Sequence, residues 1–236
     1  MTTYASTVSP DRESTGLQAV LLDMDGTLVD TEDLWWEAEC SLLAEHGHVL
    51  GPADRQAVVG GPMSRVVAHL LAVSGADLTA ELFSAMINER FTQMIAGGVP
   101  LRPGAAALLA ELAAEGVPTA LVSAAHRRII DLVLRSLGGH PFGFTVAGDE
   151  VERTKPHPDP YLLAAARLGA DPARCVVIED APTGVRAGEA AGCRVLAVPS
   201  VTPIEALPGR TVLESLEGVS VALLRGLVPG TDRASR

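Results

Sequence analysis

The sequence predicts an α/β protein with a Rossmann-like parallel sheet core and an inserted all-helical cap domain. Short apolar runs bounded by turn residues alternate with helical stretches along most of the chain, which is typical of βαβ units. The alternation breaks once, between residues 32 and 100, where the pattern is helical almost throughout. With 236 residues, 47% of them hydrophobic, the chain is long enough for one large domain, or for one domain that carries a small inserted one.

Five short apolar runs predict the strands of the sheet, because a strand covered on both faces is apolar along its length. The first, Leu17–Leu22, runs into Asp-Met-Asp-Gly. The other predicted strands are Pro118–Val122, Phe144–Ala147, Cys175–Ile178 and Arg194–Val198. The predicted helices between them are Gly104–Glu115, Arg127–Leu137, Tyr161–Leu168 and Gly184–Ala191. The pattern after Pro208 is too weak to assign.

The helical block follows directly after the first predicted strand. Glycine and proline separate its three main stretches, WWEAECSLLAEHG, MSRVVAHLLAVSG and AELFSAMINERFTQMIAGG. An insertion at this point is expected over the carboxyl edge of the sheet, where open α/β sheets bind ligands. We therefore predict a polar tail at residues 1–16, a core domain at 17–31 and 101–230, and a cap domain at 32–100.

Charge and cysteine content argue against several classes of protein. The net charge of −11 leaves no basic surface to attract nucleic acid or anionic lipid. No apolar run reaches the roughly 20 residues that span a bilayer, so we expect no membrane association. The three cysteines are widely spaced and form no CxxC pair, which argues against a disulfide framework or a zinc site. We expect a cytoplasmic protein that is a monomer or a weak dimer.

The segment after the first strand carries two carboxylates, Asp23 and Asp25, followed by Gly26. Side chains at i and i+2 of a strand point the same way, so the two carboxylates are close together. They repel each other unless a cation lies between them or one holds a proton, and Mg²⁺ is a natural partner for such oxygen ligands. Taken alone, the pattern fits an Asp-Gly turn that closes the strand equally well.

Polar residues also follow two other strands and occupy one loop. Ser123 follows the second strand, where its hydroxyl can donate to a phosphate oxygen or cap the next helix. Lys155 precedes a proline that restricts the backbone, so its ammonium can be aimed, although a lone lysine is usually solvated. Glu179 and Asp180 follow the fourth strand, where they can complete a metal shell or simply favour the helix dipole.

In this order, Asp-x-Asp-Gly-Thr, Ser, Lys-Pro and Glu-Asp resemble the four motifs of the haloacid dehalogenase superfamily. The resemblance extends from about Val20 to Val198, and the helical block is similar to the cap of the superfamily's phosphatase branch. It implies a Mg²⁺-dependent phosphomonoesterase that acts on a small phosphorylated metabolite, a sugar phosphate above all.

The resemblance also implies a role for each motif residue. Asp23 would attack phosphorus to form an aspartyl-phosphate, and Asp25 would act as general acid and base. Ser123 and Lys155 would hold the transferring phosphoryl group. Mg²⁺ would be bound by Asp23, by the backbone carbonyl of Asp25 and by Asp180, with Glu179 in or near the metal shell.

Related branches of the superfamily differ at a few positions. Dehalogenases lack an acid at the position of Asp25, and transport ATPases carry lysine there. Phosphonatases need a cap lysine, and residues 32–99 contain none. β-Phosphoglucomutases carry a histidine near the place of Trp35 and a lysine in a cap loop where this chain has Val59 before a glycine.

These departures favour a hydrolase. A hexose-phosphate mutase of the β-phosphoglucomutase type stays the alternative. The segment Asp30–Trp35 resembles sugar-phosphate phosphatases of the deoxyglucose-6-phosphatase type. A non-catalytic binding protein on the same scaffold is a third hypothesis. The intact set of motif residues argues against it.

Substrate contacts beyond the phosphate are predicted for Trp35, Gly60, Met63 and His126. Of the adjacent Trp35 and Trp36, one is expected to line the entrance and the other to pack in the core. Gly60 and Met63 belong to a Gly-Gly-Pro-Met turn between two helices of the cap, which we expect to face the active site. His126 lies close to Ser123 in the sequence and is a candidate contact without a catalytic role.

Overall fold

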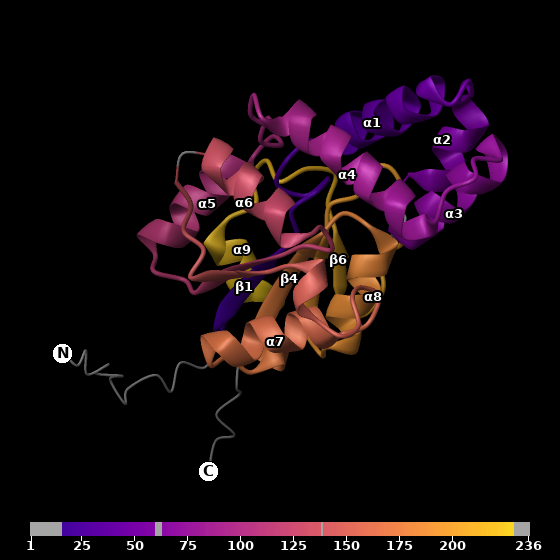
Figure 1. The fold of residues 1–236 in the computed structure, drawn as a ribbon. Helices are drawn as coiled ribbons and strands as arrows, with labels where there is room; N and C mark the ends of the chain where they lie inside the picture. Colours follow the sequence, from indigo (N-terminus) through magenta and orange to yellow (C-terminus); the bar gives the residue numbers. More distant parts are fainter. Residues whose placement is uncertain (1–15, 60–62, 138, 229–236) are drawn as a thin grey trace, which may run out of the picture.

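The computed structural model describes residues 16–59, 63–137 and 139–228. Within these residues, six parallel strands form one sheet with helices on both faces (Figure 1). The strand order is β3-β2-β1-β4-β5-β6, so the predicted Rossmann-like α/β class is confirmed. The strands are β1 (Ala19–Leu22), β2 (Thr119–Val122), β3 (Phe144–Val146), β4 (Cys175–Glu179), β5 (Arg194–Ala197) and β6 (Arg210–Val212).

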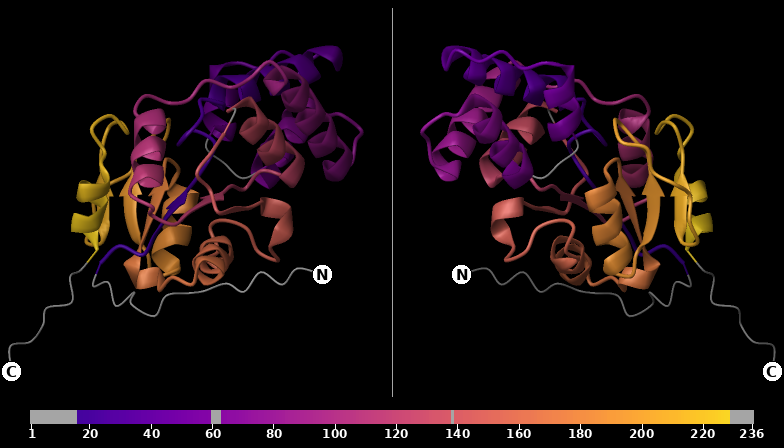
Figure 2. Two further views of the ribbon diagram at one scale, coloured as in Figure 1. Left: turned by 90° about the vertical axis from the view of Figure 1, so that its left-hand side faces the viewer. Right: turned by 90° about the vertical axis from the view of Figure 1, so that its right-hand side faces the viewer.

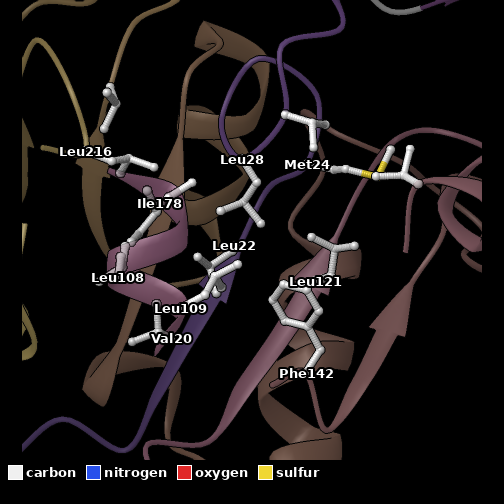
Figure 3. Packing of buried hydrophobic residues seen from close by; sticks show 14 of the residues in the cluster. Val20, Leu22, Met24, Leu28, Leu108, Leu109, Leu121, Phe142, Ile178 and Leu216 are labelled. Atoms are coloured by element: carbon white, nitrogen blue, oxygen red, sulfur yellow. The ribbon is translucent and has the colours of Figure 1, made fainter. Parts of the chain in front are cut away.

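The strands of the sheet centre are buried on both faces, and their side chains alternate between two hydrophobic clusters. In β1, Val20 and Leu22 belong to one cluster, and Ala19 and Leu21 belong to the other. Figure 3 shows the first cluster, in which Val20 and Leu22 lie among side chains from β2, β4 and α5. The two-sided burial explains why these strands are apolar along their whole length.

Helices of the core cover the two faces of the sheet. On the side of Val20 and Leu22 the apolar faces belong to α5 (Ala105–Ala114), α6 (Arg127–Ser136) and α9 (Val221–Leu227). On the opposite side they belong to α7 (Asp159–Leu168) and α8 (Pro182–Ala190). Two single turns of 3₁₀ helix, η1 (Gly148–Glu150) and η2 (Pro172–Arg174), lie in the connecting segments.

Four helices between β1 and α5 lie together beyond the carboxyl end of the sheet (Figures 1 and 2). They are α1 (Glu32–Glu45), α2 (Pro52–Val58), α3 (Met63–Ser74) and α4 (Ala80–Ile95). They share a hydrophobic cluster of their own that includes Leu42, Leu70 and Phe83. Phe91 of α4 instead joins the main core cluster, so the cap is anchored on the core. The inserted all-helical cap is therefore present, whereas the exact domain boundaries stay predictions.

Two parts of the fold differ from the sequence-based expectation. The short helix α2 was not resolved as a separate element by the sequence pattern. The weakly patterned segment after Pro208 contains the edge strand β6 and the helix α9. The strand is three residues long, all of intermediate burial, and the helix is seven residues long. Neither is long enough to display a clear hydrophobic period.

The predicted tail at residues 1–16 lies outside the described residues except for Gly16, and it stays a prediction. Among the described helices, none combines the length and apolar character that crossing a membrane requires.

Candidate active site

The strand order brings the predicted site residues together. Since β1 lies between β2 and β4, the segments that follow these three strands meet at one edge of the sheet. Asp23 follows β1, Ser123 follows β2, and β4 ends at Glu179 and continues into Asp180. Lys155, from the loop between β3 and α7, reaches the same place. These residues line one cavity of about 200 Å³.

Gly26 permits the sharp turn that follows the two aspartates. Its φ of +77° lies in the left-handed region that glycine adopts without strain. A Cβ at this position would also lie 2.1 Å from Oδ2 of Asp180, which is closer than any side chain tolerates. The turn and the close approach of Asp180 therefore both require glycine here.

Lys155 is buried and donates three hydrogen bonds. Its Nζ lies 2.6 Å from Oδ1 of Asp23, 2.7 Å from Oε1 of Glu179 and 2.8 Å from the carbonyl oxygen of Val122. Burial opposes the charged form of the amine, but Asp23 and Glu179 outweigh it and raise the pKa of Lys155. The ammonium is thus a fixed positive charge beside Asp23.

Both carboxylate oxygens of Glu179 accept hydrogen bonds, and the sequence analysis did not predict all of the donors. The hydroxyl of Tyr161, from α7, donates to Oε1 at 2.6 Å, and the backbone amide of Asp180 donates to Oε2 at 3.2 Å. Gly184 at the start of α8 leaves room for the carboxylate, because a Cβ there would lie 1.7 Å from Oε1. Glu179 thereby positions Lys155.

Asp25 is surrounded by neutral donors from the core and the cap. Ser123 Oγ donates to Oδ2 at 3.2 Å, and Thr31 Oγ1 and Trp35 Nε1 donate to Oδ1 at 2.8 and 3.4 Å. Burial, followed by the negative charge of Asp23, raises the pKa of Asp25 to about 6. A carboxyl with this pKa can release and take up a proton near neutral pH.

Ser123 does not cap the following helix. Its oxygen accepts a hydrogen bond from the amide of Ala125 at 3.0 Å, inside the loop, and the N-cap position of α6 belongs to His126. Since its own proton points to Asp25, Ser123 ties the loop after β2 to the loop after β1.

Three carboxylates form a cluster suited to a metal ion. One oxygen each of Asp23, Glu179 and Asp180 lie within 4.8 Å of one another. Oδ2 of Asp23 is buried and accepts no hydrogen bond from the described residues. Burial, together with the charges of Asp23 and Glu179, raises the pKa of Asp180 well above its usual range. A hard dication, which prefers carboxylate oxygens, would relieve this repulsion.

The two oxygens of Asp180 are already oriented by hydroxyl groups. Thr27 Oγ1 donates to Oδ1 at 3.3 Å, and Ser200 Oγ donates to Oδ2. Second partners of this kind fix the direction of a carboxylate ligand. Thr27 lies inside the predicted motif, whereas Ser200 comes from the loop after β5, where the sequence pattern held no signal.

The cavity also receives side chains from the cap. Trp35 and Trp36 both line it and both pack against the hydrophobic cluster of the cap, so the two roles are not divided between them as expected. Trp35 stacks on Phe91 with ring centroids 3.6 Å apart, so it both packs and donates to Asp25. Met63 and His126 line the cavity as well, whereas Gly60 lies outside the described residues.

Sequence reasoning missed several other residues of this cavity. Glu32, Glu39 and Asn88 of the cap line it, although the sequence analysis gave them no role. A signal for Glu39 existed, because it follows Trp35 by four residues and therefore lies on the same face of α1. Nothing comparable connects Asn88 of α4 to the motifs.

The fold and site define an α/β enzyme in which a helical cap faces buried carboxylates at the strand ends. Residues 17–192 match the model of the haloacid dehalogenase-like hydrolases. Hexitol phosphatase A of Escherichia coli (strain K12) is 38% identical over 205 residues, which are 85% of this chain and 92% of that protein. The chain belongs to the haloacid dehalogenase-like hydrolase family, and the expectation of a phosphatase agrees with this relative.

Two solved structures extend the comparison. A CbbY variant from Rhodobacter sphaeroides in complex with xylulose-(1,5)bisphosphate has a TM-score of 0.78 and 30% identity, over 88% of this chain and 99% of that one. A putative β-phosphoglucomutase from Thermotoga maritima has a TM-score of 0.70 and 27% identity, over 88% of this chain and 98% of that one.

Proposed function

We propose that this protein is a Mg²⁺-dependent phosphomonoesterase that hydrolyses a small sugar phosphate through an aspartyl-phosphate on Asp23. One observation carries the proposal. One oxygen of the buried Asp23 is held by the ammonium of Lys155, and the other has no hydrogen-bond donor among the described residues. Next to it lies Asp25, a carboxyl whose pKa is raised to about 6. The first group is placed as a nucleophile and the second as an acid and base.

In the first step, a carboxylate oxygen of Asp23 forms a bond to phosphorus while the bond between phosphorus and the ester oxygen breaks. Protonated Asp25 gives its proton to the departing oxygen, so the product is a neutral alcohol. In the second step, Asp25 takes a proton from water, whose oxygen bonds to phosphorus. The acyl phosphate bond breaks, and Asp23 returns to its carboxylate form.

Lys155 acts mainly through its charge. An ammonium has three protons, and all three are engaged by Asp23, Glu179 and the carbonyl of Val122. It can bind a phosphoryl oxygen directly only by sharing or exchanging one of these partners. Its fixed position beside Asp23 still lets it stabilise the negative charge on the transferring group. Ser123 and the loop after it would contact the same group.

The residues present fit a magnesium ion. Asp23 and Asp180 would hold it through carboxylate oxygens, and Asp25 would hold it through its backbone carbonyl oxygen. Glu179 would lie close to the ion without binding it directly. Lys155 and Tyr161 already donate to one of its oxygens, and backbone amides donate to the other. When bound, the ion supplies positive charge that lets an anionic ester approach an anionic nucleophile.

A phosphomutase is the second candidate, because a putative β-phosphoglucomutase is among the similar structures. The surroundings of Asp25 favour a hydrolase. The indole N–H of Trp35 contacts it, and Trp35 stands near the place where the resemblance puts a histidine in the mutases. In addition, Lys155 is the only lysine of the chain, so no cap lysine exists to hold a second phosphate.

The test is release of inorganic phosphate from a panel of sugar monophosphates with Mg²⁺, with product analysis by phosphorus NMR. We expect free phosphate and the dephosphorylated sugar. An isomeric sugar phosphate in place of free phosphate would identify a mutase. Replacement of Mg²⁺ by Ca²⁺ should lower the rate strongly, since the longer bonds of Ca²⁺ misplace the nucleophile. Equal rates with Mg²⁺, Ca²⁺ and excess chelator would contradict the metal role.

A further inference from the structure

We propose that the cap side of the cavity binds an uncharged, hydroxyl-rich leaving group, and that Glu39 of α1 is the side chain that hydrogen-bonds it. This inference rests on the proposed function in that it concerns the same cavity. It adds that the substrate carries no second charged group, and it adds a specificity-determining residue. Three features of the cavity support it: a buried carboxyl oxygen of Glu39 without a partner among the described residues, a cap wall whose described residues include no lysine or arginine, and a second polar group on α4.

Glu39 is an unusual residue for the inside of a helical cap. It is 4% exposed and lines the cavity, and its Oε2 atom accepts no hydrogen bond from the described residues. A buried polar atom without a partner destabilises the protein unless water or a ligand supplies the missing hydrogen bond. Since Glu39 lines the cavity, its carboxyl group lies at the wall that a bound leaving group would contact.

The protonation of Glu39 suits a hydroxyl partner. Burial, followed by the negative charge of Glu32, raises the pKa of Glu39 to about 8. At neutral pH the side chain is therefore mainly a neutral carboxylic acid, which can donate one hydrogen bond and accept others. A sugar or polyol hydroxyl can likewise accept the hydrogen bond that the carboxyl donates and donate one to its other oxygen, so the two groups are complementary.

The charge of the cap wall argues against a second anionic group on the substrate. The described cap residues that line the cavity include Glu32 and Glu39, and none of them is lysine or arginine. Residues 60–62, which are not described, are Gly-Gly-Pro and add no side-chain cation. A second phosphate or a carboxylate would thus face Glu32 without a counter-charge.

Arginines elsewhere in the cap have other partners. Arg55 pairs with Asp33, and its guanidinium lies 5.8 Å from the ring centroid of Trp36. Arg65 donates to the carbonyl oxygen of Val59 at 3.1 Å. The described cap wall therefore offers no lysine or arginine to a second phosphate group. The similar CbbY structure, in contrast, is a complex with a bisphosphate.

Asn88 of α4 supplies a second hydroxyl-binding group. It lines the cavity, is half-buried, and its Nδ2 donates to Ser84 Oγ at 3.4 Å. A side-chain amide can both donate and accept, as a neutral carboxyl can. Glu39 and Asn88 come from different helices, so together they can contact more than one hydroxyl of a leaving group.

Binding, rather than turnover, is the decisive measurement. In the Asp23→Asn background with Mg²⁺, isothermal titration is carried out with sorbitol 6-phosphate, fructose 1,6-bisphosphate, phosphoglycolate and inorganic phosphate. Sorbitol 6-phosphate should bind at least about 10-fold more tightly than the bisphosphate and phosphoglycolate. Adding Glu39→Ala should weaken sorbitol 6-phosphate at least about 10-fold and leave inorganic phosphate within about twofold. Glu39→Gln, whose amide still donates and accepts, should restore most of the loss.

Glu37→Gln is the matched control, because Glu37 lies on the same helix and is exposed. It should change none of the four dissociation constants. Equal loss of sorbitol 6-phosphate and inorganic phosphate in Glu39→Ala would overturn the proposal, and so would equal or tighter binding of the bisphosphate. The proposed function is tested separately: if wild-type protein binds sorbitol 6-phosphate selectively but releases no phosphate from any ester, the hydrolase assignment fails while this inference stands.

Discussion

At the residue scale, the site depends on two neighbouring carboxylates with different surroundings. Asp23 is paired with the ammonium of Lys155, whereas Asp25 accepts hydrogen bonds from neutral side chains of the core and the cap. Burial and the charge of Asp23 raise the pKa of Asp25, and hydrogen bonds from the neutral donors lower it by less, so the pKa is about 6. Such separation of two carboxyl groups is how one site can contain both a nucleophile and a proton donor.

Replacing Asp23, the proposed nucleophile, should therefore abolish turnover. Asp23→Asn keeps the size of the side chain but removes the charge that attacks phosphorus, and we expect kcat to fall at least about 1,000-fold. Asp30→Asn, an exposed aspartate of the same loop, is the control and should stay close to wild type. If purified Asp23→Asn kept more than a few per cent of wild-type activity, the covalent mechanism would be wrong.

Glu39 should make stability depend on pH in a direction opposite to that of a salt-bridged carboxylate. Its pKa is raised from 4.5 to about 8, so the folded state binds more protons than the unfolded state between these values. The stability contributed by this proton is fully present below about pH 4.5 and is lost as the pH rises through about 8.

Glu39→Gln removes this titration. The Tm of the variant minus that of wild type should therefore increase between pH 5.5 and pH 8.5, measured by thermal unfolding with chelator present. The exposed Glu37→Gln should give a difference that does not change with pH. A constant difference for Glu39→Gln would show that the carboxyl is not protonated in the folded state.

At the scale of elements, helix and strand ends position the charged groups. Gly184, in the first turn of α8, lies against the carboxylate of Glu179, which in turn holds Lys155 and accepts from Tyr161 of α7. The close approach of α8 to the end of β4 therefore sets the position of the ammonium beside Asp23. A change that touches no reacting group can disturb the site through this contact.

Gly184→Ala tests this arrangement. Its Cβ would lie 1.7 Å from Glu179 Oε1, so the carboxylate must move and lose contacts to Lys155 and Tyr161. We expect a destabilisation of about 1–3 kcal/mol in urea unfolding and a clear loss of kcat. Gly226→Ala in α9 is the control, since its Cβ meets open space, and it should be neutral or slightly stabilising. Wild-type kcat in Gly184→Ala would show that Glu179 does not position Lys155.

At the scale of the whole molecule, the core and the cap divide the work. The core supplies the carboxylates and Lys155 at the sheet edge, and the cap supplies the opposite wall of the cavity. Core contacts to the phosphoryl group should govern the chemical step, whereas cap contacts mainly affect binding of the leaving group. Trp35 belongs to both, because it lines the cavity from the cap and donates to Asp25.

Substitutions in the two parts should have different effects on a panel of three chemically different phosphate esters. Met63→Ala should change the order of preference, because Met63 lines the cavity from the start of α3. Lys155→Ala and Trp35→Phe should instead lower kcat/KM for all three esters by similar factors, since they act on Asp23 and Asp25. A uniform decrease in Met63→Ala would show that Met63 does not contribute to the choice of substrate.

The sequence alone predicted the core strands and the residues at their ends. Buried parallel strands are apolar along their length, so the polar groups that follow them stand out, as Asp23, Ser123 and Asp180 do. Their meeting at one edge follows from the parallel direction of the strands. The short elements after Pro208 were not predicted, because three-residue and seven-residue segments carry too little hydrophobic pattern.

Only the tertiary structure decided which polar residues of the cap and the distant loops belong to the site. Tyr161 and Ser200 reach the motif carboxylates from other elements, and Glu39 becomes buried only when the helices of the cap pack together. Burial and the pKa shifts that follow from it depend on packing between segments far apart in the chain. A pattern of neighbouring residues does not encode such contacts, which is why Trp35, Met63 and His126 could be predicted as lining residues, whereas Glu39 and Asn88 were not.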